Sequence, residues 1–158
     1  MDARRVELLQ RMPVFGALDE RALHFLVECA RHRDVPAGRW FFREGDEARS
    51  MYVLESGRAV VTRQWQGREI ELNRFGPGDC FGEMALMDLQ PRSASVQADT
   101  DCQALLLAAD DLFRLYEHDL EQFTLIQMNL GREVSRRLRD ADEALFRLSM
   151  SPGAVPRS

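Results

Sequence analysis

The sequence contains no lysine, few cysteines and no long apolar stretch. All 21 basic residues among its 158 are arginines, a compositional bias to which we attach no function. No apolar run approaches the roughly 18 residues that a membrane-spanning helix needs. The first residues also lack the apolar core of a secretory signal. These absences predict a cytoplasmic protein that does not enter a membrane.

The scarcity of cysteine and histidine argues against metal chemistry. Cys29, Cys80 and Cys102 are far apart and form no CxxC pair, and an iron–sulfur cluster needs about four cysteine ligands. The three histidines are scattered as well. We therefore expect reduced cysteines, no metal and no cofactor; a haem or iron–sulfur sensor of similar architecture is the lesser alternative. The net charge of -5 argues against a nucleic-acid surface that covers the whole domain.

The sequence has the composition of a globular domain, with 45% hydrophobic and 30% charged residues. Residues 2–12 form an amphipathic pattern that Pro13 ends, and Asp19 is a suitable N-cap for a helix over residues 20–30. We expect residues 1–34 to form an N-terminal helical segment.

Between residues 35 and 109 the pattern changes to short β-rich runs separated by glycine turns. Such spacing indicates an antiparallel β-roll or jelly roll. The predicted strands cover residues 40–42, 51–54, 59–61, 69–72, 93–97 and 104–107.

Helical character returns at residue 110. Asp110 or Asp111 is a suitable cap for a short helix that ends near Tyr116. A pattern with apolar residues every three or four positions then predicts one long helix over residues 120–148. Residues 110–150 are thus C-terminal helices, and residues 151–158 are expected to be a flexible tail. The fold class is α+β: an antiparallel β-roll flanked by N-terminal helices and a long C-terminal helix.

The segment FGEMALMDLQPRSASV, residues 81–96, suits a cyclic phosphate. Glu83 to Leu89 would form a short helix whose first amides face an anion, and Gly82 lets the backbone approach a ligand closely. Arg92 supplies a permanent charge with a fork of donors, and Ser93 adds a hydroxyl. Glu83 is better placed to accept a hydrogen bond from a sugar hydroxyl.

This segment resembles the phosphate-binding cassette of the cyclic-nucleotide-binding family. That family includes the bacterial catabolite activator protein, the regulatory subunits of cAMP-dependent protein kinase and cyclic-nucleotide-gated channels. The resemblance extends from about Val14 to Leu148. It implies that Arg92 pairs with the cyclic phosphate and that Glu83 accepts from the ribose 2′-hydroxyl. It also implies that Gly82, Met84, Ala85, Ser93 and Ala94 line the loop and that Val60 and Leu72 pack against the base.

The contact with the base is the least determined part of the site. The activator protein places two hydroxyl residues on its long helix to contact adenine, and the corresponding positions here are Ala141 and Asp142. Asp142 either accepts from a base or belongs to a solvated helix face. By resemblance, Arg137 also reaches the pocket. We expect cAMP as the ligand, with cGMP possible.

The sequence therefore predicts a cyclic-nucleotide receptor that signals through an unidentified protein partner. Only ten residues follow Leu148, too few for a helix-turn-helix unit, so we expect no DNA binding by this chain alone. No nucleophile–base set is present, so we expect no enzyme. A homodimer through the C-terminal helix is possible. The alternative is a regulatory fragment of a transcription factor or of a cyclic-nucleotide-gated channel.

Overall fold

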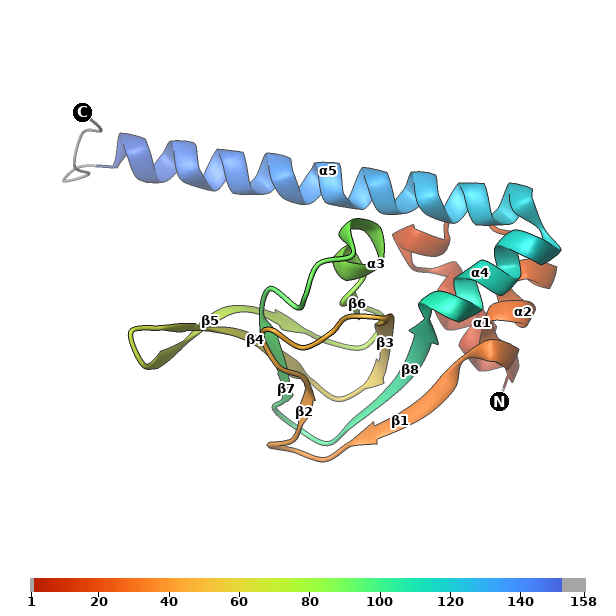
Figure 1. Cartoon of the computed structure of the whole chain (residues 1–158), viewed down its shortest axis with the longest axis horizontal. Helices are drawn as coiled ribbons and strands as arrows, with labels where there is room; N and C mark the ends of the chain where they lie inside the picture. Colours follow the sequence, from red (N-terminus) through yellow and green to blue (C-terminus); the bar gives the residue numbers. More distant parts are fainter. Residues whose placement is uncertain (1, 152–158) are drawn as a thin grey trace.

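The computed structural model describes residues 2–151. In this part of the chain eight strands form a β-roll, with helices before the first strand and after the last one (Figure 1). The elements before and within the roll are α1 (Asp2–Gln10), the 3-10 helix η1 (Pro13–Phe15), α2 (Glu20–Cys29), β1 (Arg31–Val35), β2 (Trp40–Phe42), β3 (Ser50–Ser56), β4 (Ala59–Trp65), β5 (Arg68–Phe75), β6 (Cys80–Phe81), α3 (Met84–Asp88), β7 (Ser95–Ala98) and β8 (Cys102–Ala108). They are followed by α4 (Ala109–His118) and α5 (Leu120–Met150).

The roll consists of two four-stranded antiparallel sheets. Their strand orders are β1-β8-β3-β6 and β2-β7-β4-β5. This architecture confirms the predicted fold class. Two strands were not predicted: β1 is polar and mostly exposed, and β6 has 2 residues, so neither shows an apolar alternation. The first strand therefore begins inside the stretch that we expected to be helical.

The N-terminal helices hold the first half of α5 against the body of the molecule. Ile126 and Leu130 of α5 are buried in the core formed with α1, η1, α2 and α4. Asn129 Nδ2 donates to the carbonyl oxygens of Val14, at 3.1 Å, and Gly16, at 2.8 Å. Gln122 accepts from the backbone amide of Asp19 at 2.9 Å. The start of α5 is therefore fixed by apolar burial and by buried hydrogen bonds.

The second half of α5 is different, because every residue from Leu138 to Met150 is exposed. It extends past α3 and over the β4–β5 side of the roll (Figure 1). The helix predicted over residues 120–148 is present with an end two residues later, and residues 152–158 of the predicted tail lie outside the described residues. In the part of the chain from residue 2 to 151, no helix combines the length and the apolar character needed to cross a membrane.

Candidate ligand-binding site

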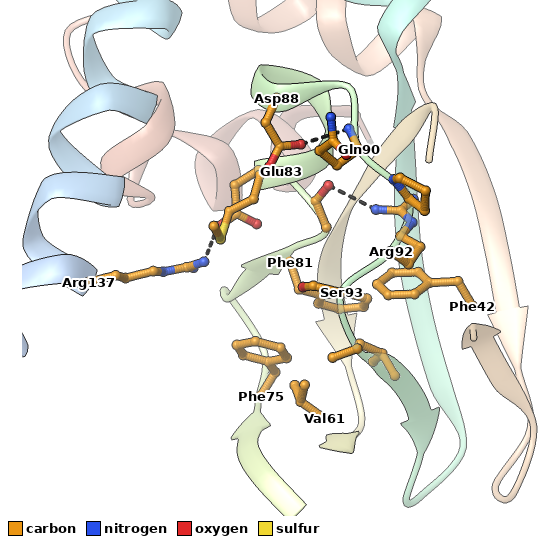
Figure 2. Close-up of a pocket in the computed structure, with 15 residues that line it drawn as sticks. Phe42, Val61, Phe75, Phe81, Glu83, Asp88, Gln90, Arg92, Ser93 and Arg137 are labelled. Atoms are coloured by element: carbon orange, nitrogen blue, oxygen red, sulfur yellow. Dashed lines mark hydrogen bonds and ion pairs between the residues drawn. The ribbon is translucent and has the colours of Figure 1, made fainter. Parts of the chain in front are cut away.

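A cavity of about 230 Å³ lies between the β-roll, α3 and the middle of α5 (Figure 2). Its polar side comes from the segment that contains α3 and the loop before β7, and its apolar side comes from the strands. Arg137 closes the α5 side. The lining residues are Phe42, Val61, Phe75, Phe81, Gly82, Glu83, Met84, Asp88, Gln90, Pro91, Arg92, Ser93, Ala94, Val96 and Arg137.

Arg92 is buried in the cavity wall, with 5% of its surface exposed. Its Nη1 donates to the carbonyl of Gly82 at 2.9 Å, and its Nη2 donates to the carbonyl of Ser50 at 2.7 Å. The guanidinium carbon lies 3.9 Å from the ring centre of Phe42. Burial lowers the pKa of Arg92, but a guanidinium remains protonated in proteins. The Nε donor is buried without a partner among the described residues.

Glu83 places a carboxylate at the opposite side of the cavity and is 0% exposed. The guanidinium of Arg137 forms an ion pair with its Oε1, and Arg137 Nε lies 3.6 Å from Glu133 Oε1. Neither oxygen of Glu83 accepts a well-aligned hydrogen bond from the described residues. Burial raises the pKa of Glu83, and the charge of Arg137 opposes that rise. Glu83 is thus a desolvated acceptor with unused capacity.

Gly82 brings the two charged residues together. Its φ of 82° is in the left-handed region that favours glycine. A Cβ at this position would come within 2.6 Å of Arg92 Nη1. The glycine therefore lets the chain turn between Phe81 and Glu83 while the guanidinium packs directly against its backbone.

The strands supply an aromatic floor. The rings of Phe75 and Phe81 are stacked with their centroids 5.2 Å apart. The ring centroid of Phe42 lies 6.2 Å from that of Phe81. Val61 of β4 completes this floor (Figure 2). A flat apolar group can pack here while its polar end reaches Arg92 and Glu83.

This arrangement is suited to binding and offers little for covalent chemistry. The unpaired Nε donor of Arg92 and the Oε2 of Glu83, which has no partner among the described residues, fit a ligand that carries an anion beside a hydroxyl group. Burial raises the pKa of the nearby Cys80 to about 12, so this thiol is protonated and a poor nucleophile. Within residues 2–151, no cluster of three His, Cys, Asp or Glu side chains could hold a metal ion.

Comparison with known proteins agrees with this chemistry. The profile of the cyclic nucleotide-binding domain matches residues 32–119. The chain belongs to the cyclic nucleotide-binding domain family. It is 34% identical over 138 residues to the "Cyclic AMP receptor protein" of Thermus thermophilus, covering 87% of this chain and 62% of that protein. The chain thus spans less than two thirds of this relative.

Two further similarities concern the sequence and the fold. A "cAMP-dependent protein kinase regulatory subunit" of Emericella nidulans is 34% identical over 107 residues, which cover 68% of this chain and 26% of that protein. A crystal structure of a cyclic nucleotide-binding domain from Methylobacillus flagellatus superposes with a TM-score of 0.82, at 19% identity, covering 96% of this chain and 86% of that one. The second match concerns the fold alone.

The cyclic nucleotide-binding domain brings most of the predicted site residues into one cavity. Those that line it are Gly82, Glu83, Met84, Arg92, Ser93, Ala94 and Arg137. Ala85 lies in α3, and its side chain is outside the described part of the chain.

Three of the residues considered for contact with the base do not line the cavity. Val60 does not line the cavity, because alternation along β4 directs its neighbour Val61 inward instead. Leu72 is 57% exposed at a bulge in β5, where Asn73 pairs with Val61 and Glu71 pairs with Thr62. Asp142 is exposed on α5, beyond the cavity. These positions depend on strand register and helix placement, which the cassette motif does not specify.

The aromatic floor was missed by sequence analysis. Phe42, Phe75 and Phe81 come from three different strands. Phe75 and Phe81 flank the Gly-Pro-Gly turn, a signal that could have placed both at the same edge of the roll. Asp88 and Gln90 also line the cavity, and no sequence motif distinguished them as site residues.

Proposed function

We propose that this chain is a receptor for a cyclic nucleotide monophosphate and transmits its binding to a protein partner. One observation carries the proposal: buried groups of opposite charge, Arg92 and Glu83, keep unused hydrogen-bonding capacity in the same cavity. Leaving such groups unpaired is costly, so a ligand that satisfies both gains affinity from each.

The phosphate would bind on the side of Arg92. Its guanidinium provides the charge, and the hydroxyl of Ser93 and the backbone amides of residues 82–85 provide further donors. The ribose would bind on the side of Glu83, whose carboxylate accepts from the 2′-hydroxyl. The base would pack against Val61 and Phe75. In this pose each end of the ligand meets a group of complementary chemistry.

Arg137 would link the ligand to α5. It belongs to the helix that closes the cavity, and it is paired with the carboxylate that the ribose would use. When the ribose occupies Glu83, Arg137 becomes free to contact the phosphate or the base, and α5 moves over the ligand. The extent of this movement is limited by the difference between the affinities of the open and closed states for the nucleotide.

Among nucleotides we propose cAMP as the preferred ligand and cGMP as the weaker one. The support is that relatives at 34% identity are named for cAMP. Asp142 has no place in the cavity, so it contributes to base choice only if α5 or a second copy brings it there. A second candidate is that the chain is the regulatory part of a longer transcription factor or channel, which its coverage of 62% of the Thermus protein favours.

Calorimetric titration with cAMP and with cGMP tests the receptor. We expect binding to the wild type and, for Arg92→Leu, a loss of about 2–5 kcal/mol of binding free energy, because the phosphate would be left unpaired. Arg39→Leu, on an exposed loop outside the cavity, is the matched control.

If the wild type binds neither nucleotide, the receptor proposal is wrong. If Arg92→Leu binds as well as the wild type, the assigned site is wrong. A cyclic-nucleotide turnover assay on the same samples tests the absence of catalysis.

A further inference from the structure

The outer side of α4 carries two exposed aromatic rings. Phe113 is 57% exposed and Tyr116 is 45% exposed, and their rings are stacked with centroids 5.7 Å apart. Tyr116 also meets the ring of Phe123 of α5 edge-on, at 5.3 Å. Leu120 lies one turn before Phe123 on the same side of α5 and is 57% exposed. We call these four residues the α4 patch; it lies where α4 meets α5, at the end of the molecule away from the C-terminal half of α5 (Figure 1).

The charged side chains beside the α4 patch are acidic. Asp110 and Glu117 lie three residues before and four residues after Phe113, so helical periodicity places all three on the same side of α4. Both carboxylates are exposed. The arginine of α4 lies on another side, next to α2: burial raises the pKa of Cys29 in α2, and the charge of nearby Arg114 opposes that rise. The patch is therefore apolar at its centre and negative at its rim.

Two further basic side chains near α4 are engaged elsewhere. His118 stacks on Phe25 of α2, with the ring centroids 4.9 Å apart, so it is turned toward the N-terminal helices. Arg49 approaches the start of α4, where its carbonyl oxygen accepts from the amide of Ala109 at 2.8 Å. Its guanidinium, however, pairs with Glu47. The outer side of α4 therefore keeps its negative charge.

This combination of aromatic centre and acidic rim restricts the kind of partner. Contiguous exposed apolar groups with a polar rim typically mark an interaction surface, and aromatic residues are enriched among those that dominate binding energy. The negative rim repels the phosphates of nucleic acids and of anionic membranes, whereas it attracts Lys and Arg side chains. A helix with apolar residues on one side and basic residues beside them is complementary to the α4 patch in both polarity and charge.

We propose that the α4 patch is the docking surface for a basic amphipathic helix of a protein partner. The apolar side chains of that helix pack against Phe113, Tyr116 and Leu120, and its Lys or Arg side chains lie opposite Asp110 and Glu117. The proposal rests on the proposed function only for the partner which that function requires. The docking surface is separate from the nucleotide site, because no residue of the patch or its acidic rim lines the cavity.

A designed peptide tests the docking surface without knowledge of the natural partner. The probe is a fluorescein-labelled helix of about 18 residues, with Leu on one side and Lys beside it; the same peptide with Glu in place of Lys is its control. We expect the Lys peptide to bind the full chain in fluorescence anisotropy and the Glu peptide not to bind at the same concentration. If the Lys peptide does not bind, or if both peptides bind equally, the docking surface is wrong. These titrations contain no nucleotide, so either result leaves the receptor proposal to its own calorimetric test.

Two matched pairs of substitutions locate the bound peptide. Phe113→Ser should weaken binding of the Lys peptide about 10-fold, whereas Phe146→Ser, which removes an exposed ring from α5, should leave it unchanged. Glu117→Arg should weaken binding about 5-fold or more, whereas Glu143→Arg, which changes the net charge equally, should not. Equal effects within either pair would mean that the peptide binds elsewhere and would contradict the proposal. If Phe113→Ser lowers the mass of the chain alone in light scattering, a second copy occupies the patch and the separate partner is wrong.

Discussion

Glu83 and Arg92 have opposite charges and line the same cavity, yet neither neutralises the other. Arg92 donates to backbone carbonyls of Gly82 and Ser50, and Glu83 pairs with Arg137 of α5. The cassette therefore keeps a cationic side and an acceptor side separate, which suits a ligand whose phosphate and hydroxyl are adjacent. A direct ion pair between the two would have removed both binding groups.

A prediction at the residue scale follows from the burial of Glu83. Its pKa is raised in the folded state, so the folded protein binds this proton more tightly than the unfolded chain. The free energy of unfolding therefore falls as the pH rises from the unfolded pKa of Glu through the raised folded pKa. Glu83→Gln removes this cost, and we expect it to be more stable than the wild type in urea at pH 7. The difference should shrink at about pH 4, where the carboxyl is protonated.

Glu143→Gln is the matched control for this experiment, because Glu143 is exposed on the same chain's α5. Its stability should equal that of the wild type at both pH values. A Glu83→Gln variant that is less stable than the wild type at pH 7 would mean that the ion pair with Arg137 outweighs the burial of the charge.

At the scale of elements, features that depend on neighbouring residues were predicted from the sequence, whereas positions that depend on the pairing of distant strands were not. The N-cap of α2 was found because Asp19 accepts from the amide of Ala22 within one turn, at 2.8 Å. The cassette was found because its glycine, glutamate and arginine lie close together in sequence. Val60 and Leu72 do not line the cavity, because the face of a residue depends on strand register, and a bulge at Leu72 changes that register. Tertiary structure, rather than local pattern, decided these positions.

The anchoring of α5 gives a prediction at this scale. Asn129→Ala removes the donor to Val14 and Gly16 and leaves buried carbonyl groups unpaired. We expect a loss of about 2 kcal/mol in the free energy of unfolding, measured as a lower urea midpoint with an unchanged slope. Asn73→Ala, on exposed β5, should change the midpoint little. An Asn129→Ala midpoint equal to that of the wild type would show that apolar packing alone fixes the start of α5.

At the scale of the whole molecule, α5 has an apolar flank that is largely exposed. Helical periodicity places Val134, Leu138 and Leu145 about a quarter turn from Arg137, which marks the side toward the roll, and Leu138 is 61% exposed. Repeating apolar positions of this kind favour a parallel helix pair between two copies. We therefore expect a dimer whose mass, measured by light scattering, falls to that of the monomer on dilution.

Leu138→Glu should shift the wild-type dimer to monomer at equal concentration, because it places like charges opposite each other across the two-fold axis. Phe113→Glu, which changes an exposed aromatic residue on α4, should leave the dimer intact.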